Sequence, residues 1–259
     1  MAKSVLCTVE GSIGMLIFNK PENRNAMDET FFADLEQGYS ALEDDPQVRV
    51  ILMKSTHPKV FLAGADIAYM VNNSPAKAKA FCDLGSRIFN RMERGTKPII
   101  AVINGHCLGG GLELALSCDI RIATVNAKLG FPEVKLGILP GWGGIHRFAR
   151  LVGEARAKEL FYTGRLLTAQ EAFQLGLVNR AVESDQLDAC VAEMAAQIQG
   201  SAPIPLRLIK QWLPSIMQSA DATAGMLASA AMVDCFASQD QKEGMQAFLE
   251  KRSPQFQGK

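Results

Sequence analysis

The chain has 259 residues and carries 27 Lys and Arg against 27 Asp and Glu, so its formal net charge is zero. Nucleic-acid binding needs a surplus of cations facing phosphates, and no apolar run approaches the roughly 18 residues of a membrane span. The first residues lack the apolar stretch of a secretory signal. We therefore expect a cytoplasmic globular protein with neither nucleic acid nor membrane as partner. Its six cysteines form no CxxC motif and are expected to be buried and reduced.

The first half of the chain alternates short β-branched runs with helical stretches. After Asp28, apolar residues recur at helical spacing, which predicts a helix that begins there. Alternation of strands and helices favours parallel strands joined by crossover helices, as in α/β proteins. The predicted strands are 5–9, 15–18, 48–53, 98–103 and 120–124, and the predicted helices are 30–43 and 76–93.

The second half of the chain is mostly helical. Glycines separate three short helical stretches, at 143–152, 154–163 and 168–175. One strand-like piece follows at 177–182, and the pattern is helical from Asp185 onward. The α/β part is therefore expected to come first, with a helical region after it.

A run of three glycines, Gly109 to Gly111, lies between the predicted strand at 98–103 and an apolar helical stretch. Glycines there let a ligand approach the main chain, and the first helical turn presents free N–H groups. A dinucleotide-binding loop needs a third glycine where this chain has leucine, so that match is poor. The other interpretations are an oxyanion site built from main-chain amides and a tight structural junction without a ligand.

Two glutamates stand out for their surroundings. Glu113 falls in the first turn of the predicted helix, in an apolar stretch where a carboxylate is costly unless it has a partner or a task. A favourable contact with the helix dipole is the structural alternative. Glu133 follows Pro132 in a Gly- and Pro-rich segment that is typical of an active-site wall. Two carboxylates that converge near main-chain amides would form an acid/base pair.

These segments together resemble the enoyl-CoA hydratase (crotonase) family. The family's motifs occur in order at 60–67, where an Ala-Gly-Ala-Asp turn leads into a helix, and at 109–115, 131–133 and 139–144. Residues 19–26 and 242–251 are also similar to that family. The resemblance extends over nearly the whole chain, and the combined motifs are specific although each alone is not.

The resemblance implies the fold and the partners. It implies an α/β fold with a crotonase-like spiral of ββα units over residues 1–195. A C-terminal helical region over 196–259 would then form a homotrimer or a dimer of trimers. It implies an acyl-CoA substrate, whose coenzyme A is part of the substrate, and no separate cofactor. No metal is expected, because the sequence offers no His, Cys and Asp cluster with ligand spacing.

The family's site residues transfer to this chain position by position. The resemblance implies that the N–H groups of Ala65 and Gly110 hold the thioester oxygen. Glu113 would orient and deprotonate a water that attacks the β-carbon, and Glu133 would supply the proton to the α-carbon. The implied contacts with the acyl-CoA are Ala63, Ala65, Asp66, Ile67, Ala68, Gly109 and Trp142, with Phe248 and Lys251 reaching it from a neighbouring subunit.

The presence of both glutamates favours hydration over isomerisation, because isomerases of this family commonly lack a carboxylate at the position of Glu113. The alternatives are enoyl-CoA isomerisation or another acyl-CoA transformation of the family, and a non-catalytic, RNA-binding relative. Two departures from the family pattern stand out, since Trp142 replaces a frequent small residue and Ala68 a frequent Lys. A bulky Trp142 is expected to narrow or redirect the acyl pocket, and a short or medium enoyl-CoA is the expected substrate.

Overall fold

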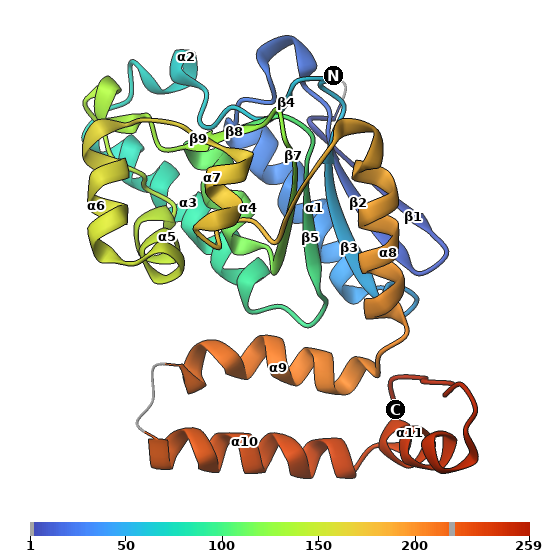
Figure 1. The fold of residues 1–259 in the computed structure, drawn as a ribbon. Helices are drawn as coiled ribbons and strands as arrows, with labels where there is room; N and C mark the ends of the chain where they lie inside the picture. Colours follow the sequence, from blue (N-terminus) through green and yellow to red (C-terminus); the bar gives the residue numbers. More distant parts are fainter. Residues whose placement is uncertain (1–2, 218–220) are drawn as a thin grey trace.

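The computed structural model of the chain describes residues 3–217 and 221–259. In these ranges the strands form two sheets (Figure 1). The six-stranded sheet has the order β1-β2-β3-β5-β7-β10, with β1 (Val5–Glu10), β2 (Ile13–Phe18), β3 (Val50–Ser55), β5 (Ile99–Ile103), β7 (Ile120–Thr124) and β10 (Arg180–Val182). The four-stranded sheet has the order β4-β6-β8-β9, with β4 (Val60–Leu62), β6 (His106–Leu108), β8 (Lys128–Gly130) and β9 (Leu167–Thr168).

Helices cover the sheets, and side-chain caps fix the starts of several of them. The Asp28 carboxylate accepts a hydrogen bond from the N–H of Phe31 at 2.8 Å, which confirms the predicted start of α1. The helices of the main body are α1 (Glu29–Asp44), α2 (Ile67–Met70), α3 (Pro75–Glu93), α4 (Gly110–Ser117), α5 (Gly144–Val152), α6 (Glu154–Thr163), α7 (Ala169–Gln174) and α8 (Leu187–Gln199). The 3-10 helices are η1 (Pro21–Asn23), η2 (Glu133–Leu136) and η3 (Ser184–Gln186).

The topology is a spiral of repeated units. β1 and β2 form an antiparallel hairpin, and every later neighbouring pair in the large sheet is parallel. After the hairpin the chain repeatedly places one strand in the large sheet, one strand in the small sheet and then a helical turn or helix: β3-β4-α2, β5-β6-α4 and β7-β8-η2. This repeat confirms the predicted α/β spiral of ββα units.

The strands of the small sheet are absent from the sequence-based prediction. β4, β6 and β8 have three residues each, too few to show a period of two. β6 therefore lies between β5 and the glycine run, inside the segment that follows the predicted strand at 98–103. Only Gly109 precedes the helix, because Gly110 and Gly111 are already its first residues. The strand predicted at 177–182 forms only over Arg180–Val182.

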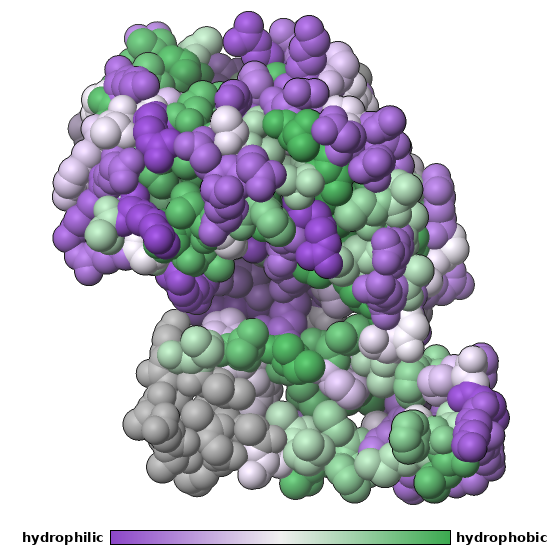
Figure 2. Space-filling view, in the orientation of Figure 1, coloured by the Kyte–Doolittle hydropathy of each residue, from purple (hydrophilic) through white to green (hydrophobic). Residues whose placement is uncertain are grey.

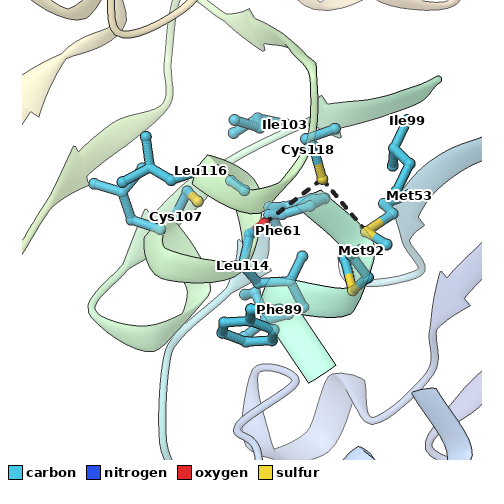
Figure 3. Close-up of a cluster of buried hydrophobic side chains, with 14 of the residues drawn as sticks. Met53, Phe61, Phe89, Met92, Ile99, Ile103, Cys107, Leu114, Leu116 and Cys118 are labelled. Carbon is cyan, nitrogen blue, oxygen red and sulfur yellow. Dashed lines mark hydrogen bonds between the residues drawn. The ribbon is translucent and has the colours of Figure 1, made fainter. Parts of the chain in front are cut away.

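The hydrophobic core lies between the large sheet and helices α1, α3 and α4. Figure 3 shows Met53 of β3, Leu114 of α4 and Cys118 meeting in its interior. The Cys118 thiol donates to the Leu114 carbonyl oxygen and lies 3.6 Å from Met53 Sδ. A buried free thiol behaves as a small apolar side chain. The core thus fixes α4, the helix that carries Glu113.

All six cysteines are free thiols. Burial was predicted correctly only for Cys107 and Cys118, which lie in the core. It is wrong for the others: Cys7 of the edge strand β1 is exposed, and Cys82, Cys190 and Cys235 are partly exposed.

Three helices extend from the main body: α9 (Pro203–Ile216), α10 (Asp221–Phe236) and α11 (Gln239–Glu250) (Figure 1). Figure 2 shows apolar surface gathered over this part of the molecule. Met217 is 73% exposed and Phe248 is 83% exposed. The predicted boundary between residues 195 and 196 falls inside α8, and residues 218–220 of the predicted helical region lie outside the described residues. Among the helices described, none combines the length and the apolar character needed to cross a bilayer.

Candidate active site

A cavity of about 570 Å³ opens between α2, α3, the start of α4 and the segment 132–142. It lies where the small sheet meets the helices that follow its strands. Most of the predicted site residues line it together, although they come from four separate segments: Ala63, Ala65, Ile67, Gly109, Gly110, Glu113, Glu133 and Trp142.

Two main-chain turns meet at one end of the cavity, around Gly64 and Gly110. Gly64 has a φ of +110°, and a Cβ placed on it would lie 3.0 Å from the Leu108 carbonyl oxygen and 3.3 Å from the Gly110 nitrogen. This position therefore needs glycine for its backbone angle and for the close approach of the two turns.

The N–H groups of Ala65 and Gly110 are both available at this junction. Ala65 forms a parallel bridge with Met27, in which Met27 N–H donates to Gly64 O and Asp66 N–H donates to Met27 O, each at 2.8 Å. Because main-chain groups alternate in direction along an extended segment, the Ala65 N–H points away from Met27. Gly110 is the first residue of α4, so its N–H has no acceptor inside the helix. Two main-chain donors therefore lie close together at this end of the cavity.

Glu113 extends from the first turn of α4 and is only 2% exposed. Its Oε1 accepts two hydrogen bonds, from the N–H of Trp142 and from the N–H of Gly144, each at 2.7 Å. A Cβ on Gly144 would lie 2.6 Å from Glu113 Cγ, so glycine there allows the loop to close over the carboxylate. The two donors fix one carboxylate oxygen of Glu113, and the residue lines the cavity.

Glu133 begins η2 and faces the same cavity from the other wall. It is 8% exposed. A Cβ on Gly109 would lie 2.9 Å from Glu133 Oε1, so this carboxylate packs against the glycine turn. Among the described residues nothing hydrogen-bonds to Glu133 Oε2. A buried oxygen without a partner is costly and is common where a group must exchange a proton.

Both carboxyl groups have raised pKa values. Burial raises the pKa of Glu113 to about 7, against the opposing effect of the N–H groups of Gly144 and Trp142. Burial also raises the pKa of Glu133 to about 7, and the charge of Glu113 adds to this rise. Near neutral pH each group can therefore gain or lose a proton at little cost, which is what general acid–base chemistry requires.

Trp142 closes the cavity beside Gly110, and its ring is held on several sides. The indole packs edge-on against Phe32, Phe81 and Phe89 at centroid distances of 5.0, 5.2 and 5.9 Å. Its Nε1 donates to the Phe81 carbonyl oxygen at 3.2 Å. The ring is a fixed wall, because leaving this position would break the hydrogen bond and these contacts.

Four predicted residues lie elsewhere. Asp66 and Ala68 do not line the cavity, and the Asp66 carboxylate caps α2 by accepting from Tyr69 N–H at 3.1 Å. Phe248 and Lys251 do not line the cavity of their own chain. Phe248 belongs to α11 and Lys251 follows it, and α11 lies at the opposite end of the molecule from α2 (Figure 1). Their predicted role depends on a second subunit.

The sequence-based reasoning missed the wall that α3 contributes. Phe81 and Cys82 line the cavity, and their segment was predicted only as a helix. The apolar periodicity of α3 shows that one face is buried but not which element it meets. Over the described ranges, the structure contains no group of three or more His, Cys, Asp or Glu side chains that could hold a metal ion.

Known proteins resemble this chain in sequence and in fold. The sequence profile described as Enoyl-CoA hydratase/isomerase matches residues 8–259. A crotonyl-CoA hydratase of Syntrophomonas wolfei is 42% identical over 254 residues, which are 98% of either chain. A short-chain-enoyl-CoA hydratase of Clostridium acetobutylicum is 40% identical over 96% of this chain and 95% of its own. The crystal structure of an enoyl-CoA hydratase from Bacillus anthracis superposes with a TM-score of 0.95 at 33% identity, over 99% of this chain and 100% of the other. The chain therefore belongs to the enoyl-CoA hydratase/isomerase (crotonase) family.

Proposed function

We propose that this protein is an enoyl-CoA hydratase that adds water reversibly across the 2,3-double bond of a short-chain 2-enoyl-CoA. One observation carries the proposal: Glu113 and Glu133 line the same cavity as the main-chain turns of Ala65 and Gly110. Relatives at 42% and 40% identity are a crotonyl-CoA hydratase and a short-chain-enoyl-CoA hydratase, which supports the same assignment.

The two main-chain donors would stabilise the enolate. Attack of water on the β-carbon moves an electron pair through the double bond onto the thioester oxygen. The N–H groups of Ala65 and Gly110 would hold this oxygen as its charge develops. Fixed donors in a cavity with little water are worth more than in bulk solvent, and loss of one such donor typically costs about 10²–10³ in rate.

The hydrogen bonds divide the acid and base roles. Glu113 has one oxygen fixed by two N–H donors, which favours its ionised form, so it would act as the base that takes a proton from the attacking water. Glu133 has a free buried oxygen beside the glycine turn. It would deliver a proton to the α-carbon as the enolate collapses. The product is the 3-hydroxyacyl-CoA, and proton exchange between Glu113 and Glu133 through the solvent restores the starting state.

The fixed Trp142 ring would limit the acyl chain. The acyl group must leave the junction of Ala65 and Gly110 and pass between the glutamates, where the Trp142 ring stands against α3. A wall held by three aromatic rings does not move aside for a longer chain. The substrate would therefore be a short enoyl chain such as crotonyl.

The test is hydration of crotonyl-CoA by the purified protein. The expected result is loss of the conjugated thioester absorbance and formation of 3-hydroxybutyryl-CoA, identified by chromatography and mass. Glu154→Gln, which changes a glutamate on the exposed face of α6, serves as a matched control and should leave the rate unchanged. Conversion of 3-enoyl-CoA to 2-enoyl-CoA without any hydration would favour the isomerase alternative instead.

We also propose that the chain works as a trimer or a dimer of trimers. The exposed apolar side chains on the C-terminal helices support association, since patches of this kind mark interaction surfaces. In such an assembly Phe248 and Lys251 of one subunit would reach the coenzyme A bound to another. Light scattering coupled to size-exclusion chromatography would give a mass of three or six chains; a monomer that retains full activity would contradict the proposal.

A further inference from the structure

A buried guanidinium lies behind the loop that holds Glu113. Arg147 of α5 is 1% exposed and is the largest fully buried side chain among the described residues. Its Nη1 donates to the Trp142 carbonyl oxygen at 2.9 Å. Trp142 therefore uses its N–H on Glu113 and its carbonyl on Arg147.

The loop between Arg147 and Glu113 contains two glycines, which let the two side chains approach its main chain from opposite faces. Gly143 has a φ of +93°, and a Cβ on it would overlap the Arg147 guanidinium. On the other face, a Cβ on Gly144 would collide with Glu113. The two glycines let one strip of main chain fit between a buried cation and a buried carboxylate.

Other partners fix the guanidinium from the side away from the loop. Arg147 Nε donates to Glu93 Oε2 at 2.8 Å, and Nη2 donates to Asn90 Oδ1 at 2.6 Å. Arg150 binds the second oxygen of Glu93 at 2.7 Å. Burial acts to raise the pKa of Glu93, but the charges and hydrogen bonds of Arg147 and Arg150 outweigh it and hold that pKa below its ordinary value. Glu93 is thus a stable anion that anchors the fork of Arg147.

We propose that Arg147 is the positioning residue for Glu113: through the Trp142 carbonyl it aims the N–H groups of Trp142 and Gly144 at the carboxylate and keeps it in the form that accepts a proton. Arg147 does not line the cavity, so it acts on the substrate only through the loop. The kinetic part of this proposal rests on the proposed hydratase function, and the structural part does not.

The direction of the effect follows from charge. A buried carboxylate is destabilised as an anion, whereas a nearby cation and aimed N–H dipoles favour the anion. The positive charge of Arg147 lowers the pKa of Glu113 against the larger effect of burial, and the N–H groups of Gly144 and Trp142 act in the same direction. Loss of Arg147 should therefore raise the pKa of Glu113.

Few other charged or titratable groups act on Glu113. Glu133 of η2 faces it across the cavity and interacts with it unfavourably. Cys82 of α3 also lines the cavity, and burial followed by the charge of Glu113 raises the pKa of its thiol. Neither group carries a positive charge, so neither can replace Arg147 in stabilising the ionised form of Glu113.

The experiment compares Arg147→Met, Arg147→Lys and Arg150→Met. Methionine keeps the length of the side chain and removes its charge and donors, and Lys restores the charge without the fork. Arg150→Met is the matched control, because Arg150 touches Glu93 but not Trp142 and is partly exposed. The pH dependence of kcat/KM on crotonyl-CoA is measured for each variant, together with kcat and KM.

For Arg147→Met we expect the acid limb of the kcat/KM profile to move to higher pH by about one unit, with a lower kcat and a nearly unchanged KM. Arg147→Lys should fall between Arg147→Met and the wild type, and Arg150→Met should match the wild type. An unchanged acid limb in a folded Arg147→Met would overturn the proposal, because a merely structural residue would lower the yield of active protein and leave the profile in place. If Arg147→Met does not fold, the same criterion applies to Arg147→Lys with a smaller shift.

A second measurement separates this proposal from the hydratase assignment. Carbon-13 NMR of protein labelled at the glutamate carboxyl carbons reports the titration of Glu113, assigned by its disappearance in Glu113→Gln. The Glu113 midpoint should rise in Arg147→Met and stay in place in Arg150→Met. If the wild type does not hydrate crotonyl-CoA, the hydratase assignment fails, and this titration alone decides the role of Arg147.

Discussion

The indole ring of Trp142 occupies the space that a side chain on Gly110 would need. The same Trp142 donates its main-chain N–H to Glu113 at 2.7 Å. Trp142 therefore contacts both the start of α4 and the candidate base. We expect a substitution at Gly110 or at Trp142 to disturb the start of α4, the cavity wall and the position of the Glu113 carboxylate.

Gly110→Ala should impair both folding stability and catalysis. The new methyl group would overlap a ring that is fixed by Phe32, Phe81 and Phe89, so the strain cannot relax cheaply. We expect kcat on crotonyl-CoA to fall about a hundredfold or more, as for a lost oxyanion donor, and the melting temperature to fall.

The double variant Gly110→Ala with Trp142→Leu checks the cause. Leucine leaves room for the methyl group, so the combined loss of stability should be smaller than the sum of the two single losses. Additive losses in thermal unfolding would show that the two positions do not compete for the same space.

Gly64→Ala should separate the turns of Ala65 and Gly110, which are the proposed oxyanion donors. A methyl group at Gly64 would press on the Leu108 carbonyl and on the Gly110 nitrogen, and the φ of +110° is unfavourable for alanine. We expect kcat to fall by about 10²–10³ because the two N–H groups no longer meet at one oxygen.

Gly176→Ala is the control for backbone strain at Gly64. Gly176 has a φ of +73° with no atom within 4 Å of its added Cβ, and it does not line the cavity. It should lose about 1–2 kcal/mol of stability and retain kcat. Equal losses of kcat in both variants would argue that strain, and not the oxyanion geometry, limits the enzyme.

Trp142→Leu should widen the range of acyl chains. Removing the indole leaves room beside Gly110 and α3, so kcat/KM for hexenoyl- and decenoyl-CoA should rise relative to crotonyl-CoA. Loss of packing should cost about 1–3 kcal/mol in the free energy of unfolding.

Phe148→Leu provides the control for this loss of core packing. Phe148 is 1% exposed and packs against Phe131 and Phe161, away from the cavity lining. It should lower stability without altering the order of substrates. An unchanged chain-length profile in Trp142→Leu would mean that another wall limits the acyl group.

Glu113→Gln should be more stable than the wild type at alkaline pH. Burial raises the pKa of Glu113 to about 7 in the folded protein, whereas an unfolded Glu titrates at about 4.3. The folded state therefore binds more protons than the unfolded state between these values, and the stability of the wild type falls as pH rises through this window.

Glutamine can still accept both N–H bonds at its Oε1 but carries no charge to bury. At pH 8 we expect a gain of about 4 kcal/mol at most, which vanishes near pH 4. Denaturant unfolding over this pH range measures it, with Glu154→Gln as the variant that should follow the wild type. If Glu113→Gln were less stable than the wild type at pH 8, the ionised Glu113 carboxylate would not destabilise the folded state.

The sequence was most informative where a motif is short and local. Asp28 as a helix cap and the long helices depend on neighbours a few residues apart, so periodicity and capping chemistry predict them well. The convergence of Glu113 and Glu133 was predictable only because the family's motifs are recognisable. Nothing in the spacing of two glutamates by itself places them on one cavity.

Contacts between segments far apart in the chain could not be predicted from the sequence. The four-stranded sheet consists of strands of two or three residues, which are too short to show a period of two in the sequence. The link from Glu93 through Arg147 to the Trp142 carbonyl joins α3 to α5. Trp142 was expected to narrow the pocket, but its main-chain bond to Glu113 has no signature in the sequence. Such relationships depend on three-dimensional packing that a single sequence does not encode in any local pattern.

The most direct test of the account is the rate of crotonyl-CoA hydration by Glu113→Gln, Glu133→Gln and the double variant, each verified as folded. Because the two carboxylates are proposed to act on one substrate as a unit, each single variant should lose most of the activity, and the double variant should be scarcely worse than the weaker single one. Hydration that persists at near wild-type rate when both glutamates are replaced would contradict the account.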